Sequence, residues 1–163
     1  MSNPGSTAVV LHQLLTPATI KLTLTGATRN DVLTELVAQI PQLVAQPDAR
    51  QRLFQALVER EQLHSTGIGD GIALPHARNA LAGIVDQPII VVGRHAQGIA
   101  YGAVDGKPAR LFFLLVAPSV TQHLAILARI SRLLRNPDLR QNLLNADKPE
   151  KVLALIREAE AKM

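Results

Sequence analysis

Residues 105–122 read DGKPARLFFLLVAPSVTQ and contain a turn followed by the most apolar run of the chain. Asp105-Gly106 is a dipeptide typical of tight turns, so residues 99–104 and 109–116 are expected to form a hairpin. The segment 111–116, LFFLLV, has no polar side chain, which is typical of a strand covered on both faces. The sequence therefore predicts that this segment is the central strand of a sheet.

Helices are expected on both sides of this strand along the chain. Ser119 and Gln122 have the spacing of a capping box, which predicts that a helix begins directly after the strand. Thr28 offers a second N-cap, and Pro41 should bend or end the helix that follows it. Apolar spacing and the prolines together predict helices at 28–40, 48–61, 119–135, 137–145 and 149–159.

Two further segments favour strands. Residues 20–25 alternate apolar and polar side chains, and residues 89–92 are an unbroken apolar run. Strands and helices are thus mixed, with at least one antiparallel pair, so the expected class is α/β (α+β): a single domain with a mixed β-sheet flanked by helices. We expect residues 1–9 to be a flexible N-terminus and residues 10–160 to form the domain.

Composition narrows the possible functions of this 163-residue chain. It has no cysteine, which excludes disulfides and thiol nucleophiles and fits a cytoplasmic protein. The net charge is +4, but the basic residues do not cluster and only 2% of residues are aromatic, so nucleic-acid binding is not expected. Arg129, Arg132 and Arg135 are interpreted as a solvated helix face. Neither a signal peptide nor a membrane-inserted segment is expected, because Pro118 interrupts the longest uncharged stretch.

The stretch 65–78, STGIGDGIALPHAR, singles out one of the five histidines. Its three glycines permit backbone angles that other residues resist, and such loops can direct N–H groups at an anion. Pro75 then stiffens the chain directly before His76. By spacing alone, the slightly favoured interpretation is that the glycines form a turn into an edge strand and that His76 follows it by chance, without a function. The stretch lacks the phosphate-cradling pattern of nucleotide-binding loops.

Two other residues raise the interest of His76. Arg60 falls near the end of a predicted helix, on or beside its apolar stripe, although a cation there also simply complements the helix dipole. His123 falls in the first turn of the 119–135 helix, where the positive dipole end attracts anions and tends to keep an imidazole neutral. Exposed first-turn histidines are ordinary, and the remaining histidines, His12, His64 and His95, are interpreted as bystanders.

Taken together, these residues resemble the type-2 enzyme IIA domain of the bacterial phosphoenolpyruvate-dependent phosphotransferase system, which includes fructose, mannitol and nitrogen-type members. The resemblance covers roughly residues 10–160, and its specific part is the stretch that ends in Pro75-His76. The matching segments are Arg60, STGIG at 65–69, GIALPH at 71–76, His123 and, more weakly, residues 103–118 and 133–139.

The resemblance implies the fold of that family and a site for phosphoryl transfer. His76 matches the phospho-acceptor, while Arg60 and His123 match the arginine and second histidine that flank it. Many members have glycine after the acceptor, whereas this chain has Ala77 and then Arg78, which could contact the phosphoryl group or a partner. The residues expected to stabilise the phosphoryl group through loop donors are Ser65, Thr66, Gly67, Gly69 and Gly71.

Three functions remain open at this point. The first is a phosphocarrier that accepts a phosphoryl group on His76 from an HPr-like protein and acts as a stand-alone, nitrogen-type regulator. The second is a sugar-specific enzyme IIA that passes the group to an enzyme IIB, and the third is a binding module of the same fold that is not phosphorylated. No cofactor is required, and a zinc site at His76 and His123 has weak support because no third ligand is evident. The oligomeric state is open.

Overall fold

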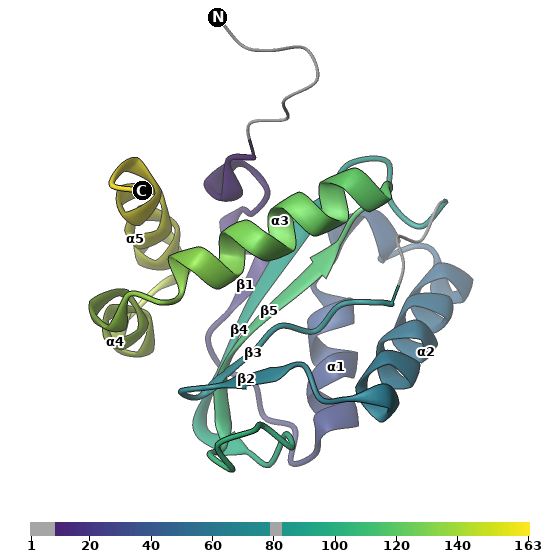
Figure 1. The fold of residues 1–163 in the computed structure, drawn as a ribbon. Coiled ribbons are helices and arrows are strands. Elements are labelled where there is room, and N and C mark those ends of the chain that lie inside the picture. The colour runs from purple at the N-terminus through teal and green to yellow at the C-terminus, as the bar shows by residue number, and fades with distance from the viewer. Residues whose placement is uncertain (1–8, 79–82) are drawn as a thin grey trace, which may run out of the picture.

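The computed structural model describes residues 9–78 and 83–163 (Figure 1). The expectation of a flexible segment at residues 1–9 therefore falls almost entirely outside the described residues. Within them, five strands form one sheet in the order β1-β4-β5-β3-β2. The strands are β1 (Ile20–Lys21), β2 (Gly67–Gly69), β3 (Ile72–Ala73), β4 (Ile89–Ile99) and β5 (Ala109–Val116).

The sheet is mixed, with β5 in its centre. Strand β5 pairs antiparallel with β4 and parallel with β3, and the outer strands pair parallel for β1 with β4 and antiparallel for β2 with β3. This arrangement confirms the predicted α/β (α+β) class and the central position of residues 111–116. Helices cover both faces of the sheet: α1 (Arg29–Ala38), α2 (Pro47–Leu63), α3 (Val120–Leu133), α4 (Pro137–Asn145) and α5 (Pro149–Ala161), with 3₁₀ turns η1 (Leu11–Gln13), η2 (Pro17–Thr19) and η3 (Pro41–Leu43).

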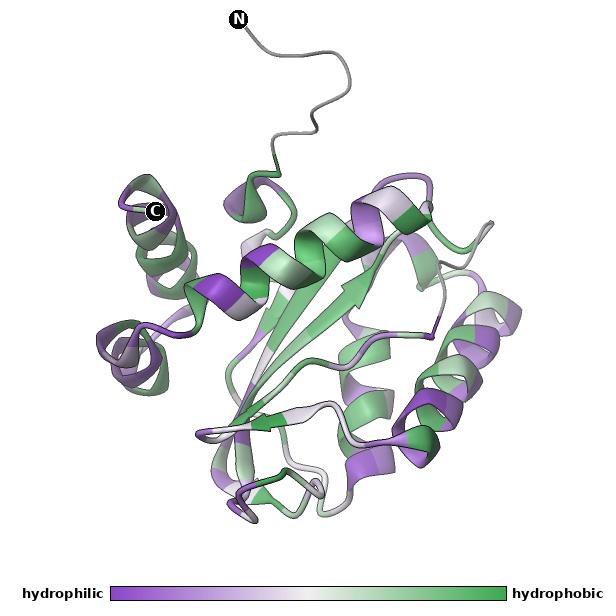
Figure 2. Cartoon of the chain, in the orientation of Figure 1, coloured by the Kyte–Doolittle hydropathy of each residue, from purple (hydrophilic) through white to green (hydrophobic). Residues whose placement is uncertain are grey.

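Strand β5 divides the core into two layers, because successive side chains of a strand point to opposite faces. Leu111, Phe113 and Leu115 pack in a cluster with residues of α3, α4 and α5. Phe112 and Leu114 pack in a second cluster with residues of α1 and α2. The two layers explain why residues 111–116 of β5 lack polar side chains, and Figure 2 shows the central strands as the most hydrophobic part of the fold.

The helix boundaries follow local signals. The Thr28 side chain accepts a hydrogen bond from the Asp31 amide, and the Ser119 side chain accepts one from the Gln122 amide, as the capping patterns predict. Helix α1 ends at Ala38 before Pro41. Helix α2 differs from the prediction of a start at Asp48, since Pro47 is its first residue. Proline suits that position because its missing N–H would have no helical partner there.

Two strand predictions were wrong in extent. The hairpin partner of β5 is β4, with Ile89 opposite Val116 and Ile99 opposite Ala109, whereas residues 100–108 form the connection. The turn within that connection is present, because the Gly106 amide donates to the Ala103 carbonyl at 3.0 Å. Residues 20–25 contribute only a two-residue strand: Ile20 and Lys21 pair with β4, and the chain then turns toward α1.

The apolar stripes were also only partly right. The helical spacing of Leu124, Leu127, Ile130, Leu133 and Leu134 predicts one buried stripe, but Leu124 is exposed, while Ile126 and His123 of the same helix are buried. The side of α3 that faces the sheet is therefore rotated relative to the predicted stripe. The spacing of the first helix also continues to Val44 in the sequence, but Val44 follows η3 and is exposed.

Candidate functional site

The candidate site lies where the central strand ends. His76 forms an isolated parallel bridge with Leu115 of β5, and the Leu115 amide donates to the Pro75 carbonyl at 3.0 Å. Helix α3 begins four residues after β5 and carries His123 in its first turns. The two imidazole rings therefore meet at this edge, with their centroids 5.5 Å apart and their planes inclined by 61°.

One hydrogen bond sets the orientation of His76. Its Nδ1 lies 2.6 Å from the Leu74 carbonyl oxygen. A carbonyl oxygen can only accept, so Nδ1 carries the hydrogen in the neutral ring and Nε2 keeps its lone pair. Burial lowers the pKa of His76 below 6.5, and the charge of Arg60 lowers it further, against the opposing effects of the Leu74 carbonyl and of Glu61. The lowered pKa favours the neutral ring at physiological pH, with the lone pair on Nε2.

His123 is held in the same neutral state. Its side chain is only 6% exposed, and its amide donates to the Ser119 carbonyl at 3.0 Å. Burial lowers the pKa of His123, and the neighbouring His76 lowers it further. A neutral imidazole beside an incoming anion can donate one hydrogen bond without the desolvation cost of a buried charge.

Arg60 brings a permanent positive charge to the same region. It lies in the last turn of α2 and donates to the His64 carbonyl at 2.5 Å, which fixes the corner between α2 and β2. A pocket of about 470 Å³ is lined by Arg60 and Arg78, together with Ala77, the residue after His76. Glu59 also lines this pocket, and the charge of Arg60 lies near enough to His76 to lower its pKa.

The structure separates two of the glycines from this arrangement. Gly69 and Gly71 have positive φ angles of 93° and 78° and form the turn between β2 and β3. The Leu111 amide donates to the Gly71 carbonyl, whereas His76 lies opposite Leu115. Four strand residues correspond to about 13 Å. The two glycines therefore shape the hairpin and do not lie beside His76, which corrects the expectation that they hold a phosphoryl group.

The donors at the start of the stretch already have partners inside the protein. The Ser65 hydroxyl donates to the Tyr101 carbonyl at 2.5 Å and accepts from the Gly67 amide at 3.0 Å. The Thr66 amide and hydroxyl both donate to Glu61. These donors build the hairpin that carries His76, so their expected contact with a phosphoryl group would require exchange of existing bonds.

Of the other histidines, His95 has a structural role and His64 has none that the structure shows. His95 lies with Nε2 at 2.9 Å from the Gly26 carbonyl, and its Nδ1 accepts from the Gly98 amide at 3.0 Å, so both ring nitrogens are used. His64 has an exposed side chain. Across residues 9–78 and 83–163, no group of three or more histidine, aspartate or glutamate side chains could hold a metal ion.

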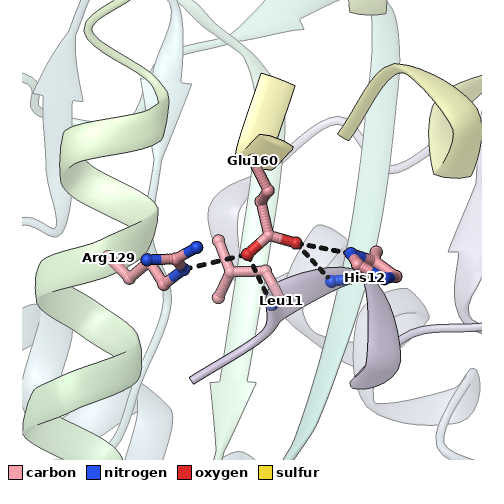
Figure 3. A network of polar contacts seen from close by, with 4 residues as sticks. All are labelled: Leu11, His12, Arg129 and Glu160. Atoms are coloured by element: carbon pink, nitrogen blue, oxygen red, sulfur yellow. Dashed lines mark hydrogen bonds and ion pairs between the residues drawn. The ribbon is translucent and has the colours of Figure 1, made fainter. Parts of the chain in front are cut away.

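Figure 3 shows a polar network that the sequence did not indicate. Glu160 of α5 is 6% exposed and accepts hydrogen bonds from the Leu11 and His12 amides, each at 2.8 Å. Its oxygens also lie 2.8 Å from Nδ1 of His12 and 2.9 Å from Nε of Arg129. Arg129 is therefore partly buried in an ion pair, contrary to the interpretation as a solvated face. The partners are up to 149 residues apart, so no local pattern could reveal them.

A second buried carboxylate was also missed. Glu61 follows Arg60 in α2 and is 4% exposed, and it accepts from Thr66 and from the Tyr101 hydroxyl at 3.0 Å. Glutamate in a surface helix usually faces water, so its sequence position alone indicated nothing.

The fold agrees with comparison to known proteins. Residues 13–159 match the family described as phosphoenolpyruvate-dependent sugar phosphotransferase system, EIIA 2. The chain therefore belongs to this family, as its motifs predicted. Membership implies a part in phosphoryl transfer between proteins.

The relatives carry both regulatory and sugar-specific names. A nitrogen regulatory protein of Pseudomonas aeruginosa is 34% identical over 148 residues, which are 90% of this chain and 94% of that protein. A fructose-specific EIIABC component of Bacillus subtilis is 36% identical over 150 residues, which are 91% of this chain. The chain spans only 23% of the length of that second relative.

Solved structures share the same fold. The nitrogen regulatory protein IIA-Ntr of Neisseria meningitidis superposes with a TM-score of 0.78 at 26% identity, covering 89% of this chain and 97% of that one. Enzyme IIAMtl of Escherichia coli, solved in a complex with phosphorylated enzyme IIBMtl, superposes with a TM-score of 0.74 at 22% identity, covering 88% and 97% of the two chains. In the described part of this chain, no helix is both long and apolar enough to cross a bilayer.

Proposed function

We propose that this protein is a phosphocarrier of the phosphotransferase system and that Nε2 of His76 accepts the phosphoryl group. The observation that carries the proposal is the 2.6 Å contact between Nδ1 and the Leu74 carbonyl. It holds the hydrogen on Nδ1 and leaves Nε2 as the nucleophilic nitrogen, in a ring that lies 5.5 Å from the second imidazole. Family membership supports the chemistry, and the geometry supports the choice of residue and atom.

The transfer step conserves charge and protons. The lone pair of Nε2 forms the new N–P bond while the bond between phosphorus and the donor histidine breaks, and the donor nitrogen recovers its electron pair. The Nδ1 hydrogen stays on His76. The phosphorylated ring acquires a positive charge, which the Leu74 carbonyl stabilises. Catalysis of such a step consists mainly of positioning and electrostatic stabilisation.

Arg60 and His123 have the proposed role of binding the transferred oxygens. The Arg60 guanidinium offers a planar fork that suits a phosphoryl group, and Arg78 contributes a second positive charge to the same pocket. His123 would donate from its ring beside His76. These contacts favour the transition state, in which charge spreads over the three equatorial oxygens.

The proposed donor is an HPr-like histidine phosphocarrier protein. Leu63, Val120 and Leu124 are each more than half exposed, and they belong to the end of α2 and the start of α3, the two elements that carry Arg60 and His123. Exposed apolar side chains around a polar site are typical of a protein-docking surface. We expect these three side chains to contact the donor, in a protein that works in the cytoplasm.

The regulatory role is preferred over the sugar-specific one. The nitrogen regulatory relative of Pseudomonas aeruginosa and a fructose-like EIIA component of Escherichia coli both match this chain along nearly their whole length, and the regulatory relative is slightly more identical, at 34% against 32%. A sugar-specific role would require a cognate enzyme IIB as acceptor. Incubation of the phosphorylated protein with candidate enzymes IIB, followed by measurement of phosphate transfer, separates the two roles, and rapid transfer to one of them would favour the sugar branch.

The central test is phosphorylation by phosphoenolpyruvate, enzyme I and an HPr-like carrier, followed by intact-mass measurement. The wild-type protein should gain one acid-labile phosphoryl group, and His76→Gln should gain none. His64→Gln is a matched control, because His64 is an exposed histidine near the same hairpin. Equal labelling of His76→Gln and wild type would refute the acceptor assignment, and no labelling of the wild type by any cognate carrier would favour the non-phosphorylated binding module.

A further inference from the structure

Glu61 is a buried carboxylate whose hydrogen bonds come entirely from neutral donors. It is 4% exposed, and it accepts from the Thr66 amide at 2.8 Å, the Thr66 hydroxyl and the Tyr101 hydroxyl at 3.0 Å. Neither of the two ion pairs found among residues 9–78 and 83–163 includes it. A buried charge held in this way is costly, which calls for a reason beyond packing.

A continuous series of hydrogen bonds joins Glu61 to the candidate nucleophile. Thr66, which donates twice to Glu61, accepts from the Leu74 amide at 3.0 Å through its own carbonyl. The carbonyl of the same Leu74 lies 2.6 Å from Nδ1 of His76. Two bonds to the carboxylate and one between Thr66 and the Leu74 amide therefore help to fix the position of Leu74, and with it the residue whose carbonyl contacts His76.

The other end of the series is anchored in the core. Tyr101 is 3% exposed, and its ring packs edge-to-face against Phe112 of the central strand, with the centroids 5.6 Å apart. Burial and the nearby Glu61 charge raise the pKa of Tyr101 far above its usual value, so the phenol stays protonated and donates. The Thr66 amide, the Thr66 hydroxyl and the Tyr101 hydroxyl all point at the two oxygens of Glu61, so the corner is tied on three sides.

We propose that Glu61 is a positioning residue for the phosphoryl transfer, and that it acts through Thr66 and Leu74 to hold His76 in the tautomer with Nε2 free. This inference rests on the proposed function for its effect on rate. The other part of the inference, the effect of Glu61 on the tautomer of His76, does not depend on phosphorylation. Glu61 also follows Arg60 directly, so the carboxylate that fixes Thr66 and the guanidinium that holds the His64 carbonyl stabilise the same corner.

The test uses Glu61→Gln in the full chain. The amide side chain keeps one acceptor oxygen for the Thr66 amide but directs an NH₂ group at the two hydroxyls, which then have to accept instead of donate, so the bonds that hold the corner change direction and weaken. The ¹⁵N shifts of the His76 ring, measured in the unphosphorylated protein, should change from a dominant Nδ1–H tautomer to a mixture of tautomers. The rate of phosphorylation by the carrier should fall on the order of 10- to 100-fold, the usual effect of a small misplacement of a reacting group.

Glu160→Gln is the matched control. Glu160 is also a buried carboxylate with several donors, but it belongs to α5, at the opposite end of the molecule from α2 (Figure 1). This variant should lose stability while the His76 ring shifts and the rate of phosphorylation stay as in the wild type. Thr66→Val removes one donor to Glu61 with little change in volume and should give an intermediate mixture of tautomers.

Unchanged ring shifts in folded Glu61→Gln would overturn the proposal, as would an equal change in Glu160→Gln. If Glu61→Gln does not fold, the ring shifts of Thr66→Val decide, and wild-type shifts there would overturn it. Failure of the proposed function would look different, because the wild type would then show the Nδ1–H tautomer but would not be phosphorylated.

Discussion

Replacing Arg60 with alanine tests whether the guanidinium serves the transfer reaction or the helix end. Within residues 9–78 and 83–163, Arg60 makes one hydrogen bond, to the His64 carbonyl at 2.5 Å, and it also lines the pocket next to Ala77. The hydrogen bond stabilises the end of the helix, whereas the pocket gives a phosphoryl group access to the guanidinium. The two roles predict different results for stability and for rate.

The expected magnitudes differ enough to be separated. Loss of a hydrogen bond to a charged group in the transition state costs about 1.5–3 kcal/mol. At 1.36 kcal/mol for each factor of ten, that corresponds to a rate lowered about 10- to 150-fold. The hydrogen bond to His64 is near the surface, where such a bond contributes about 0.5–1.5 kcal/mol. For a domain of this size the melting temperature should fall by roughly 2–4 °C for each kcal/mol.

The assay compares Arg60→Ala and Arg60→Lys with the wild type. Single-turnover transfer from the phosphorylated carrier gives the rate, and thermal unfolding gives the melting temperature. Arg60→Lys keeps the charge but loses the planar fork, so its rate should lie between those of the other two proteins. A wild-type rate in Arg60→Ala, or a rate loss that only follows extensive unfolding, would refute the assignment of Arg60 to the site.

Three further predictions concern His123, protonation and the core. His123→Ala should leave His76 modifiable but change the rate or the lifetime of the phosphoryl group, followed by mass over time; unchanged kinetics would remove His123 from the site. Burial lowers the pKa of both histidines below 6.5, so the unfolded chain binds more protons in mild acid, and the free energy of unfolding should fall as the pH drops below that value. Denaturant unfolding at several pH values should show a shallower fall for His76→Gln, and an unchanged slope would contradict the pKa direction. Gly93→Ala would place a methyl group 2.7 Å from atoms of Leu24 and Leu36, so it should lose about 1–3 kcal/mol by overpacking, seen as a lower denaturation midpoint without a change in transfer rate.

Much of the fold could be predicted because its signals are local. The apolar run at 111–116 predicted the central strand, and capping residues such as Thr28 and Ser119 predicted where helices begin. The pairing partner of β5 was predicted wrongly, because residues 89–99 lie far enough along the chain that the turn dipeptide alone did not reveal the long connection. Strand register depends on both partners, and a single segment specifies only one of them.

The candidate site shows the same division. The motif around His76 identified the family and led to the proposal of His76 as the acceptor, but its glycines Gly69 and Gly71 were expected at the phosphoryl group because they are near His76 in sequence. In the structure an extended strand carries them about 13 Å away. Closeness along a chain becomes distance in space wherever the backbone is extended.

The amino-acid sequence by itself determined the class of fold, the ends of the helices and the residue that stands out as nucleophile, because capping, periodicity and proline act over a few residues. Only the tertiary structure decided which nitrogen of His76 is free, that His123 meets it at 5.5 Å, and that Glu61 is buried beneath the hairpin. The last two features depend on packing and hydrogen bonds between elements that are distant in the chain, such as the bond from Tyr101 to Glu61, whereas the bond to Leu74 is short in sequence but needs the backbone course that the sheet imposes. Such contacts exist only after the sheet and helices have assembled, so no local pattern encodes them alone.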